Sequence, residues 1–191
     1  KKIIYKNHRG INKWNSKMSK GQLGCALSHL KIYKLILKDR FDVALILEDD
    51  AIFKKKFNKK LQEFILKNFS SKPQVTLISE IKEFYKNSII KKNQYSIVDV
   101  TNAFFTHAYF INKSAAKKIL KFNFPIKTVA DNFIFFKIYC NILLKGLNPF
   151  LVTQDKKNFL SSIDYKKYSK SKRSFLFKFR AFKITNLIKK F

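Results

Sequence analysis

The sequence is poor in several residue types, and each scarcity excludes a class of protein. Its 191 residues contain two cysteines, Cys25 and Cys140, which is too few for a disulfide scaffold and is typical of a reducing compartment. Four glycines and three prolines exclude a low-complexity chain, because such chains are rich in both. No uninterrupted apolar run reaches the roughly 18 residues of a spanning helix, so we expect no membrane-crossing segment.

Acidic residues and arginine are also scarce, whereas lysine is abundant. Lys and Arg total 41 against 12 Asp and Glu, which gives a formal net charge of +29. This charge favours a polyanionic partner, either a nucleic acid or an anionic membrane. Only four of the basic residues are arginine, the side chain that reads bases and phosphates bidentately, and no known reader motif is present. Nucleic-acid binding is therefore the weaker alternative, and the lysine excess also fits codon bias in an AT-rich genome.

The apolar residues predict one sizeable core and an alternation of helices and strands. Hydrophobic residues make up 46% of the chain, and 21 of them are phenylalanine. Ser19 and Gln22 have the spacing of a capping box at the start of the first helix, and Gly146 is expected to end the last one. The pattern favours an α/β domain with a mixed central sheet flanked by helices. We expect helices over 19–39, 55–68, 114–120 and 128–144, and strands over 43–47, 75–79, 97–100, 104–111 and 150–152.

Three adjacent acids, Glu48, Asp49 and Asp50, directly follow the apolar run 43–47. In open α/β sheets, ligands bind beyond the carboxyl ends of the strands. Adjacent carboxylates repel one another unless a cation or hydrogen-bond donors compensate, and Mg²⁺ or Mn²⁺ take carboxylate oxygens and bridge to phosphates. The spacing therefore predicts a metal–diphosphate site. The alternative is a solvated turn that the nearby lysines 54–56 neutralise.

Two motifs resemble glycosyltransferase family 25, the lipooligosaccharide galactosyltransferases of Gram-negative bacteria and their collagen-modifying relatives. They are Gly-Gln-Leu-Gly-Cys-Ala-Leu-Ser-His over 21–29 and Ala-Leu-Ile-Leu-Glu-Asp-Asp-Ala over 44–51. Weaker matches follow in the same order, and the resemblance covers roughly 19–164. These later matches are Thr106 to Ile111, Pro125-Ile126 with Asp131, Pro149 to Gln154, and Ser162-Ile163.

The resemblance implies a GT-A-like nucleotide-sugar transferase fold and a UDP-hexose donor, with UDP-galactose expected. Glu48, Asp49 and Asp50 would be its acidic metal motif, with Mn²⁺ or Mg²⁺ as the cofactor. Ser28, His29 and Asp49 would contact the donor. The acceptor would be a sugar of a lipid-linked lipooligosaccharide or lipopolysaccharide. For His29 the alternative is a core histidine, because it shares a helix face with Cys25, Ile32 and Ile36. Cys25 itself is expected to be a small buried hydrophobe rather than a nucleophile.

Asp131 is the candidate general base, with His107 as the second choice. An inverting glycosyl transfer needs a carboxylate that takes the proton of the acceptor hydroxyl, and no other acid lies between Asp99 and Asp155. The alternative is structural, since Thr128 and Asp131 also have the spacing of a helix N-cap and its N3 residue. Trp14, the single tryptophan, is expected at a fringe contact rather than under a sugar.

The chain is expected to divide into a transferase domain over 1–165 and a basic tail over 166–191. The strand that opens family members is not recognisable in residues 1–18, so we expect that it is missing or divergent. A truncated, inactive family member is therefore the alternative to an active enzyme.

Apolar residues recur at helical spacing from Phe175 to Phe191, and no acid follows Asp164. This pattern favours an amphipathic helix on an anionic membrane, at the cytoplasmic face of the bacterial inner membrane. A final helix packed on the core or on a second subunit is the alternative.

Overall fold

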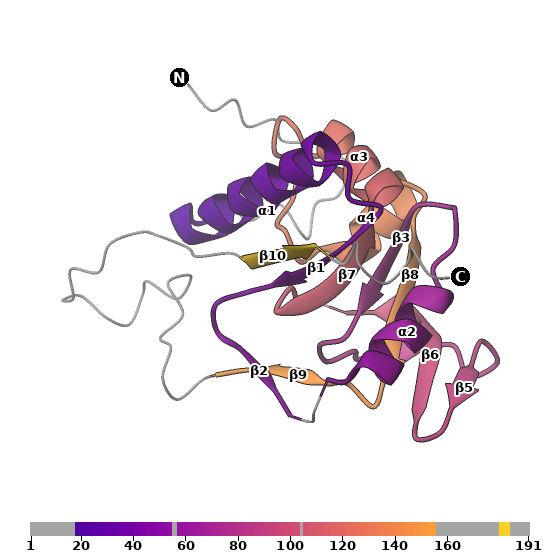
Figure 1. The fold of residues 1–191 in the computed structure, drawn as a ribbon. Helices are drawn as coiled ribbons and strands as arrows, with labels where there is room; N and C mark the ends of the chain where they lie inside the picture. Colours follow the sequence, from indigo (N-terminus) through magenta and orange to yellow (C-terminus); the bar gives the residue numbers. More distant parts are fainter. Residues whose placement is uncertain (1–17, 55–56, 104, 156–179, 184–191) are drawn as a thin grey trace.

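The computed structural model describes residues 18–54, 57–103, 105–155 and 180–183. Figure 1 shows the central sheet with its helices. The helices are α1 (Lys20–Lys38), α2 (Lys59–Lys67), α3 (Lys113–Phe122) and α4 (Phe133–Tyr139). The strands are β1 (Val43–Leu47), β2 (Ala51–Phe53), β3 (Gln74–Leu77), β4 (Glu83–Phe84), β5 (Ile90–Lys92), β6 (Tyr95–Asn102), β7 (Ala108–Asn112), β8 (Leu143–Asn148), β9 (Val152–Gln154) and β10 (Arg180–Lys183).

The first helix confirms the prediction made from its capping residues. The Gln22 backbone N–H donates to Ser19 Oγ at 3.2 Å, and the Ser19 backbone N–H donates to Gln22 Oε1 at 2.9 Å. Two orphan donors of the first turn are thereby satisfied, which fixes where α1 begins. The helix ends at Lys38, next to the expected stop at Asp39–Arg40.

The strands form a mixed sheet, as the sequence pattern predicts. In the described part of the chain the order is β10-β1-β7-β3-β8-β6-β4, with β5 paired to β6, and β2 and β9 make a separate pair. β3 and β8 run parallel, whereas β1 is antiparallel to both β7 and β10. Because β1 and β7 are antiparallel with Leu47 opposite Ala108, the residues after β1 meet the residues before β7.

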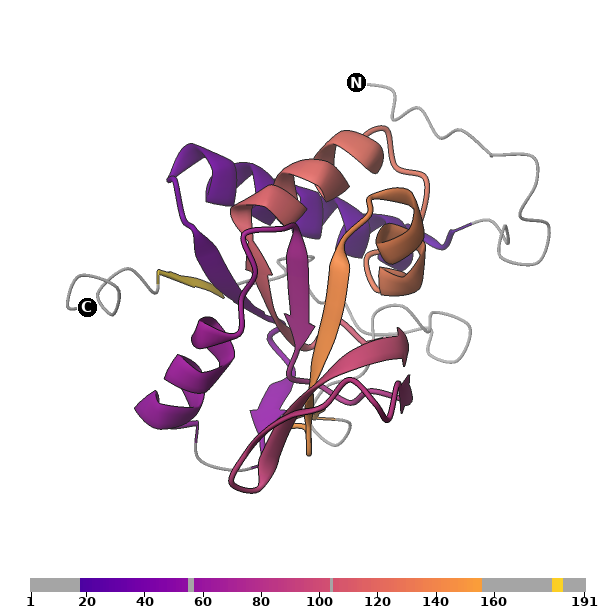
Figure 2. The ribbon, with the colours of Figure 1, turned by 90° about the vertical axis from the view of Figure 1, so that its right-hand side faces the viewer.

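Each face of the sheet carries its own apolar core. Alternate residues of β1 point to opposite faces, so Ala44 and Ile46 pack beneath α1, α3 and α4, whereas Leu45 packs against α2. Figures 1 and 2 show α1 and α3 together on one side of the sheet and α2 on the other. The helical layer of α1, α3 and α4 therefore covers one face of the sheet. His29 of α1 reaches the candidate site, described below, from this face.

The long helix predicted over 128–144 is wrong. Asn132 is the N-cap of α4, its Oδ1 accepting from the Phe135 backbone N–H at 3.3 Å, and Thr128 Oγ1 instead accepts from Asn132 Nδ2 at 2.9 Å. The helix ends at Tyr139, and the apolar run that follows is β8, which pairs with β3. A continuous apolar run has no period that separates a helix from a buried strand.

Gly146 is therefore not a helix stop, because it lies inside β8. A Cβ atom at this position would lie 2.8 Å from Val100 Cγ2 and 2.9 Å from Ile81 Cγ2. The glycine is needed for close approach between the strand and its neighbours rather than for chain reversal.

Other expected boundaries shift by a few residues. α2 is capped by Asn58 and begins at Lys59 rather than at 55, and α3 is capped by Asn112 and begins at Lys113, one residue before Ser114. The strand expected over 104–111 is β7, with residue 104 outside the described residues, and the strand expected over 150–152 is β9. These shifts do not change the order of the elements.

The tail is described only at Arg180–Lys183. Those four residues form β10, which pairs with β1 as the outermost strand of the sheet, so the expected helix is wrong there. The rest of 166–191, like Trp14 and residues 1–17, lies outside the described residues. Within the described part of the chain, none of the helices combines the length and apolar character that a bilayer crossing requires.

Candidate active site

The site begins where β1 ends, at the turn that carries Glu48 and Asp50. The backbone N–H of Glu48 donates to the carbonyl of His107 at 2.9 Å, which ties this turn to the segment before β7. The Asp50 carbonyl accepts from the Asp155 backbone N–H at 2.8 Å, next to the β2–β9 pair. Three chain segments therefore converge on the acidic turn.

The Glu48 carboxylate is surrounded by donors. Thr106 Oγ1 donates to Glu48 Oε1 at 2.5 Å, and His29 Nε2 lies 3.4 Å from the same oxygen. His107 Nδ1 lies 3.2 Å from the other oxygen, Oε2. Burial by itself raises the pKa of Glu48, but the contacts with His107, His29 and Thr106 outweigh it and hold the pKa well below its usual range. The group is therefore a carboxylate at neutral pH.

His29 links this carboxylate to two buried phenols. Its Nδ1 lies 2.7 Å from the hydroxyl of Tyr109, which in turn lies 2.8 Å from the hydroxyl of Tyr33. Burial raises the pKa of both tyrosines, so both stay protonated at neutral pH. The buried imidazole, 1% exposed, thus has its orientation fixed by Tyr109 on β7 and its Nε2 directed at Glu48. His29 is therefore a buried core residue, as its structural alternative expects, and it also contacts Glu48, while its contact with the donor stays a prediction.

Asp50 has one satisfied and one orphaned oxygen. Its Oδ2 accepts from Gln154 Nε2 at 2.8 Å. Its Oδ1 is buried and has no hydrogen-bond partner among the described residues, with His107 Nδ1 at 3.9 Å. Leaving a buried carboxylate oxygen without a donor is costly, so a cation would fit at this atom.

The chemistry of these side chains suits a divalent cation. Glu48, Asp50 and His107 each offer a ligand atom, and these atoms all lie within 4.8 Å of one another. We call these three residues the metal cluster. The two carboxylates are ligands for Mn²⁺ or Mg²⁺, with the imidazole beside them, and a cation would satisfy Asp50 Oδ1. A second group of potential ligands among the described residues is Cys25 with His29 and Glu48. Asp49 is exposed and belongs to neither this group nor the metal cluster, although the sequence pattern placed it with Glu48 and Asp50.

Asp131 lies in the loop that leads into α4. Its carbonyl accepts from the Phe133 backbone N–H at 2.8 Å, and because Asn132 is the N-cap, Asp131 precedes the helix. The structural alternative, in which Asp131 is the N3 residue of a helix capped by Thr128, is therefore wrong. Burial raises the pKa of its carboxyl, the charge of Glu48 raises it further, and His29 and His107 lower it. The carboxyl of Asp131 is thus within electrostatic reach of the metal cluster.

Two further α1 residues complete the surroundings. Burial raises the pKa of the Cys25 thiol, and the charges of Glu48, Asp131 and Asp50 add to that effect. The thiol therefore stays protonated, which agrees with a packing role rather than a nucleophilic one. Its Sγ also lies within 4.8 Å of ligand atoms of His29 and Glu48. Ser28 lies on the same helix and is half-buried.

Reasoning from the sequence did not single out Thr106, Gln154, Tyr109 or Tyr33 as site residues. Their sequence signal is weak, because each is a common polar residue in or beside an apolar run. They reach the site through pairings that connect distant segments: β1 with β7 for Thr106 and Tyr109, and β2 with β9 for Gln154. The matched segments 106–111 and 149–154 contain all but Tyr33, so the resemblance was the available clue.

The chain is similar in sequence to proteins of one known family. The sequence profile described as "Glycosyltransferase family 25 (LPS biosynthesis protein)" matches residues 1–134. Procollagen galactosyltransferase 2 of Homo sapiens is 26% identical over 112 residues, which is 56% of this chain and 17% of the human protein. Procollagen galactosyltransferase 1 of Danio rerio is 28% identical over 122 residues, 61% of this chain and 20% of that protein. The chain therefore matches about a fifth of the length of these curated relatives.

Proposed function

Because the chain belongs to glycosyltransferase family 25, we propose that it transfers galactose from UDP-galactose to a sugar hydroxyl of a glycan acceptor. The observation that carries the proposal is the metal cluster at the end of β1, with an orphaned carboxylate oxygen on Asp50 and the half-buried carboxyl of Asp131 within electrostatic reach. The names of the galactosyltransferase relatives support galactose as the sugar. The mixed sheet flanked by helices supports a GT-A-like fold.

The proposed cofactor is Mn²⁺ or Mg²⁺, held by Glu48 and Asp50 with His107 beside them. When bound, the ion neutralises charge that develops on the departing diphosphate. The protein's own part is to keep Glu48 ionised through Thr106, His29 and His107, and to hold Asp50 through Gln154. We propose that the donor is contacted by Ser28, His29 and Asp49, the last of which is exposed at the same turn.

Asp131 is proposed as the general base of an inverting transfer. The acceptor oxygen forms a bond to the anomeric carbon while the bond from that carbon to the UDP oxygen breaks, and the hydroxyl proton passes to the Asp131 carboxylate. UDP leaves with the electron pair of the broken bond. A carboxyl whose pKa is raised by burial is a better proton acceptor than an exposed aspartate, which supports this role. His107 is the second candidate for the base, but its contact with Glu48 favours a structural or ligand role.

The proposed acceptor is a sugar of a lipid-linked lipooligosaccharide or lipopolysaccharide. The printed description of the family, an LPS biosynthesis protein, supports it. Such an acceptor would place the protein at the cytoplasmic face of the inner membrane as a peripheral protein. The alternative, an inactive family member, differs in one observable: it predicts an intact fold with no affinity for UDP even when metal is present.

Calorimetric titration of the full chain with Mn²⁺ and UDP tests the proposal. We expect Mn²⁺-dependent UDP binding by the wild-type chain and a loss of at least about tenfold in Asp50→Asn, because the substitution removes a ligand charge while keeping the side-chain shape. Asp42→Asn, an exposed acid before β1, is the matched control and should bind as the wild type does.

Turnover is measured separately, as UDP released from UDP-galactose in the presence of a glycan acceptor. No UDP affinity in a chain that melts cooperatively would overturn the proposal in favour of the inactive alternative. Equal Mn²⁺-dependent binding by Asp50→Asn and the wild type would remove the metal assignment.

A further inference from the structure

A group of large apolar side chains is exposed on the helical layer formed by α3, α4 and the loop between them. We call Phe122, Phe124, Phe135, Ile138 and Tyr139 the aromatic patch. Phe124 is 58% exposed, Ile138 67% and Tyr139 52%. These helices lie on one side of the molecule in Figure 2, away from α2. Scattered exposed apolar residues are ordinary, but a contiguous group marks an interaction surface.

Three of the five side chains, Phe122, Phe135 and Tyr139, pack on one another. The Tyr139 ring stacks on Phe122 with centroids 5.8 Å apart and lies 4.2 Å from the Phe135 centroid. Phe122 and Phe135 are themselves 5.5 Å apart. The half-buried rings of Phe122 and Phe135 therefore form a base on which Tyr139 is held.

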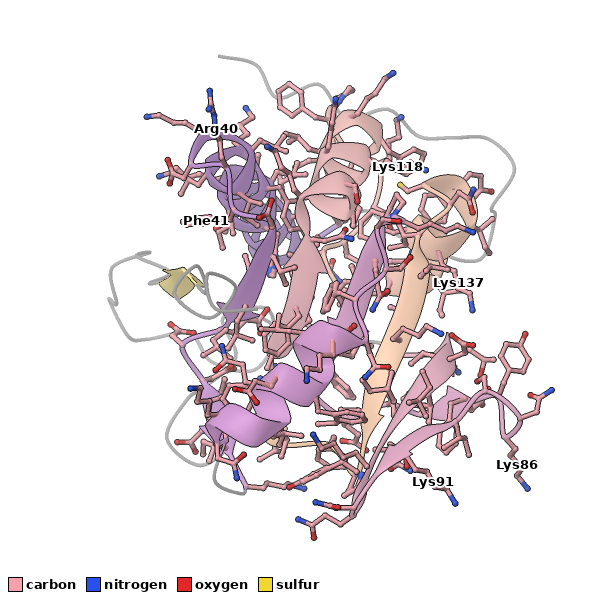
Figure 3. All side chains as sticks on the ribbon, turned by 45° about the vertical axis from the view of Figure 1, so that its right-hand side comes forward. Arg40, Phe41, Lys86, Lys91, Lys118 and Lys137 are labelled. Carbon is pink, nitrogen blue, oxygen red and sulfur yellow. The ribbon has the colours of Figure 1, made fainter. Side chains whose placement is uncertain are left out.

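Three lysines lie near the patch, and two of them are held against its rings. Lys127 Nζ lies 4.4 Å from the Phe122 centroid, and Lys34 Nζ on α1 lies 4.8 Å from the Phe124 centroid. Lys118 Nζ donates to the Asn141 carbonyl at 3.5 Å, just beyond the end of α4. Figure 3 shows Lys118 beside α3, well separated from Lys86 and Lys91 on the β4–β5 side. The cations are thus positioned around apolar side chains rather than paired with acids.

The elements that form this face carry almost no negative charge. Residues 113–141 contain a single acid, Asp131, which is half-buried. α1 contains no acid over 20–38, and Asp39 follows at its C-cap. The cationic character of the face is therefore uncompensated by its own elements.

The exposed apolar side chains and the uncompensated lysines together indicate which kind of partner can bind this face. A second copy of the chain would bring another +29 charge and another lysine ring to the contact, which disfavours self-association. A nucleic acid would meet no arginine on α1, α3 or α4, and it would offer no aliphatic surface to the side chain of Ile138. An anionic bilayer offers phosphates for the lysines and an acyl boundary for the apolar tips.

We propose that the aromatic patch docks onto an anionic lipid bilayer, with Phe124, Ile138 and Tyr139 at headgroup depth and Lys34, Lys118 and Lys127 on headgroup phosphates. The loop 123–132 carries both Phe124 and Asp131, so docking holds the candidate active site beside the bilayer. The proposal goes beyond the glycosyltransferase function and does not require it, because none of its tests depends on turnover or on UDP.

Co-sedimentation of the full chain with vesicles tests the charges. Vesicles containing phosphatidylglycerol are compared with pure phosphatidylcholine vesicles. Substitution of Lys34, Lys118 and Lys127 by Gln should lower partitioning onto the anionic vesicles by at least about tenfold, because each lysine near such a surface contributes measurably. The matched control replaces Lys86, Lys91 and Lys92 by Gln, which removes the same charge from the β4–β5 side and should lower partitioning far less (Figure 3).

Insertion of the apolar tips is tested by fluorescence. In a Trp14→Phe background, which removes the single native tryptophan, Tyr139→Trp should shift its emission to the blue on anionic vesicles. Tyr85→Trp, at a position 55% exposed on the β4–β5 side, is the control and should not shift. A further variant, with Phe124, Ile138 and Tyr139 each replaced by Ser, should lose binding while its melting temperature stays near that of the wild type, since all three side chains are more than half exposed.

Three outcomes would overturn the proposal. Equal losses in the two lysine variants would mean that net charge alone drives binding. Unchanged sedimentation of the patch variants would assign binding to another part of the chain, such as residues 166–191. Displacement from vesicles by generic duplex RNA, with loss of RNA binding in the patch variants alone, would make the face a nucleic-acid surface.

Discussion

Glu48 and His107 are joined twice, once through the backbone and once through their side chains. The Glu48 N–H donates to the His107 carbonyl at 2.9 Å, and His107 Nδ1 lies 3.2 Å from Glu48 Oε2. The first contact extends the β1–β7 pairing by one residue beyond Leu47 and Ala108. The second uses that register to place an imidazole against the carboxylate. The metal cluster is therefore a consequence of strand pairing, and its geometry depends on neighbours that hold Glu48 in place.

Thr106 is one of those neighbours, and its removal should weaken metal binding without unfolding the protein. Thr106→Val keeps the side-chain shape but removes the hydrogen bond to Glu48 Oε1. Outer contacts that orient a ligand are typically worth about 10- to 100-fold in metal affinity, so we expect a loss of about tenfold in Mn²⁺-dependent UDP affinity by calorimetry. Thr76→Val, at a buried threonine bonded to Gln74, is the control and should leave the affinity unchanged. Equal affinities for Thr106→Val and the wild type would contradict the role given to Thr106.

Asp131→Asn tests the general base. The amide keeps the shape of the side chain but cannot take a proton, so kcat should fall by about 10²- to 10⁴-fold while Mn²⁺-dependent UDP binding is retained. The split between kcat and donor affinity distinguishes a base from a donor ligand. Asp42→Asn should retain wild-type turnover. A wild-type kcat in Asp131→Asn would contradict the assignment of Asp131 as the general base and would favour His107 in that role.

The elements that the sequence predicted correctly are those with a local physical signal. Ser19 and Gln22 satisfy each other's backbone donors, and α1 begins where that spacing requires. The run Val43–Leu47 is too short for a helix and too apolar for an exposed strand, and it is β1, with the acids at its carboxyl end. Both interpretations needed only neighbouring residues, which is why they were correct.

The errors arise where long-range pairing decides the structure. Residues 128–144 are predominantly apolar, and only the pairing of β8 with β3 makes their last part a strand. Likewise no local pattern places Gln154 on Asp50, or Thr106 on Glu48, because β2–β9 and β1–β7 pairing bring them together. Asp49 was grouped with its neighbours by adjacency alone, whereas the turn exposes its side chain and buries those of Glu48 and Asp50 further.

The thiol of Cys140 should react slowly with alkylating reagents, and its ionisation should make the stability of the folded state depend on pH in the alkaline range. Burial raises the pKa of its thiol to about 11, against about 8.5 for an unfolded cysteine. The folded state therefore keeps its proton where the unfolded state loses it, and stability falls as pH rises from about 8.5 to about 11. In a Cys25→Ala background, alkylation at pH 8 should be on the order of a hundredfold slower than in the urea-unfolded chain. Replacement of Cys140 by Ala should remove its share of the alkaline loss of stability, and equal alkylation rates in folded and unfolded chains would contradict the raised pKa.

Asn112 should be the most important helix cap for stability, because its side chain makes contacts beyond the helix it caps. Its Oδ1 accepts from the backbone N–H groups of Ala115, at the start of α3, and Gln74, at the start of β3, both at 3.0 Å. Its Nδ2 donates to the carbonyls of Ser70 and Lys72. Asn112→Ala leaves a buried donor on β3 unsatisfied in addition to the lost cap, so we expect a loss of about 3 kcal/mol in the free energy of unfolding.

Asn58 provides the comparison for this prediction, because it caps α2 with a single bond to the Leu61 backbone N–H at 2.9 Å and is itself exposed. Asn58→Ala should cost only about 1 kcal/mol, the ordinary value for a lost N-cap. Urea unfolding of the two variants, with equal m-values as the check on two-state behaviour, measures the difference. Equal losses in the two variants would show that the contacts of Asn112 with β3 and with residues 70–72 add nothing to its capping bond, and that the β3–α3 corner is held by apolar packing alone.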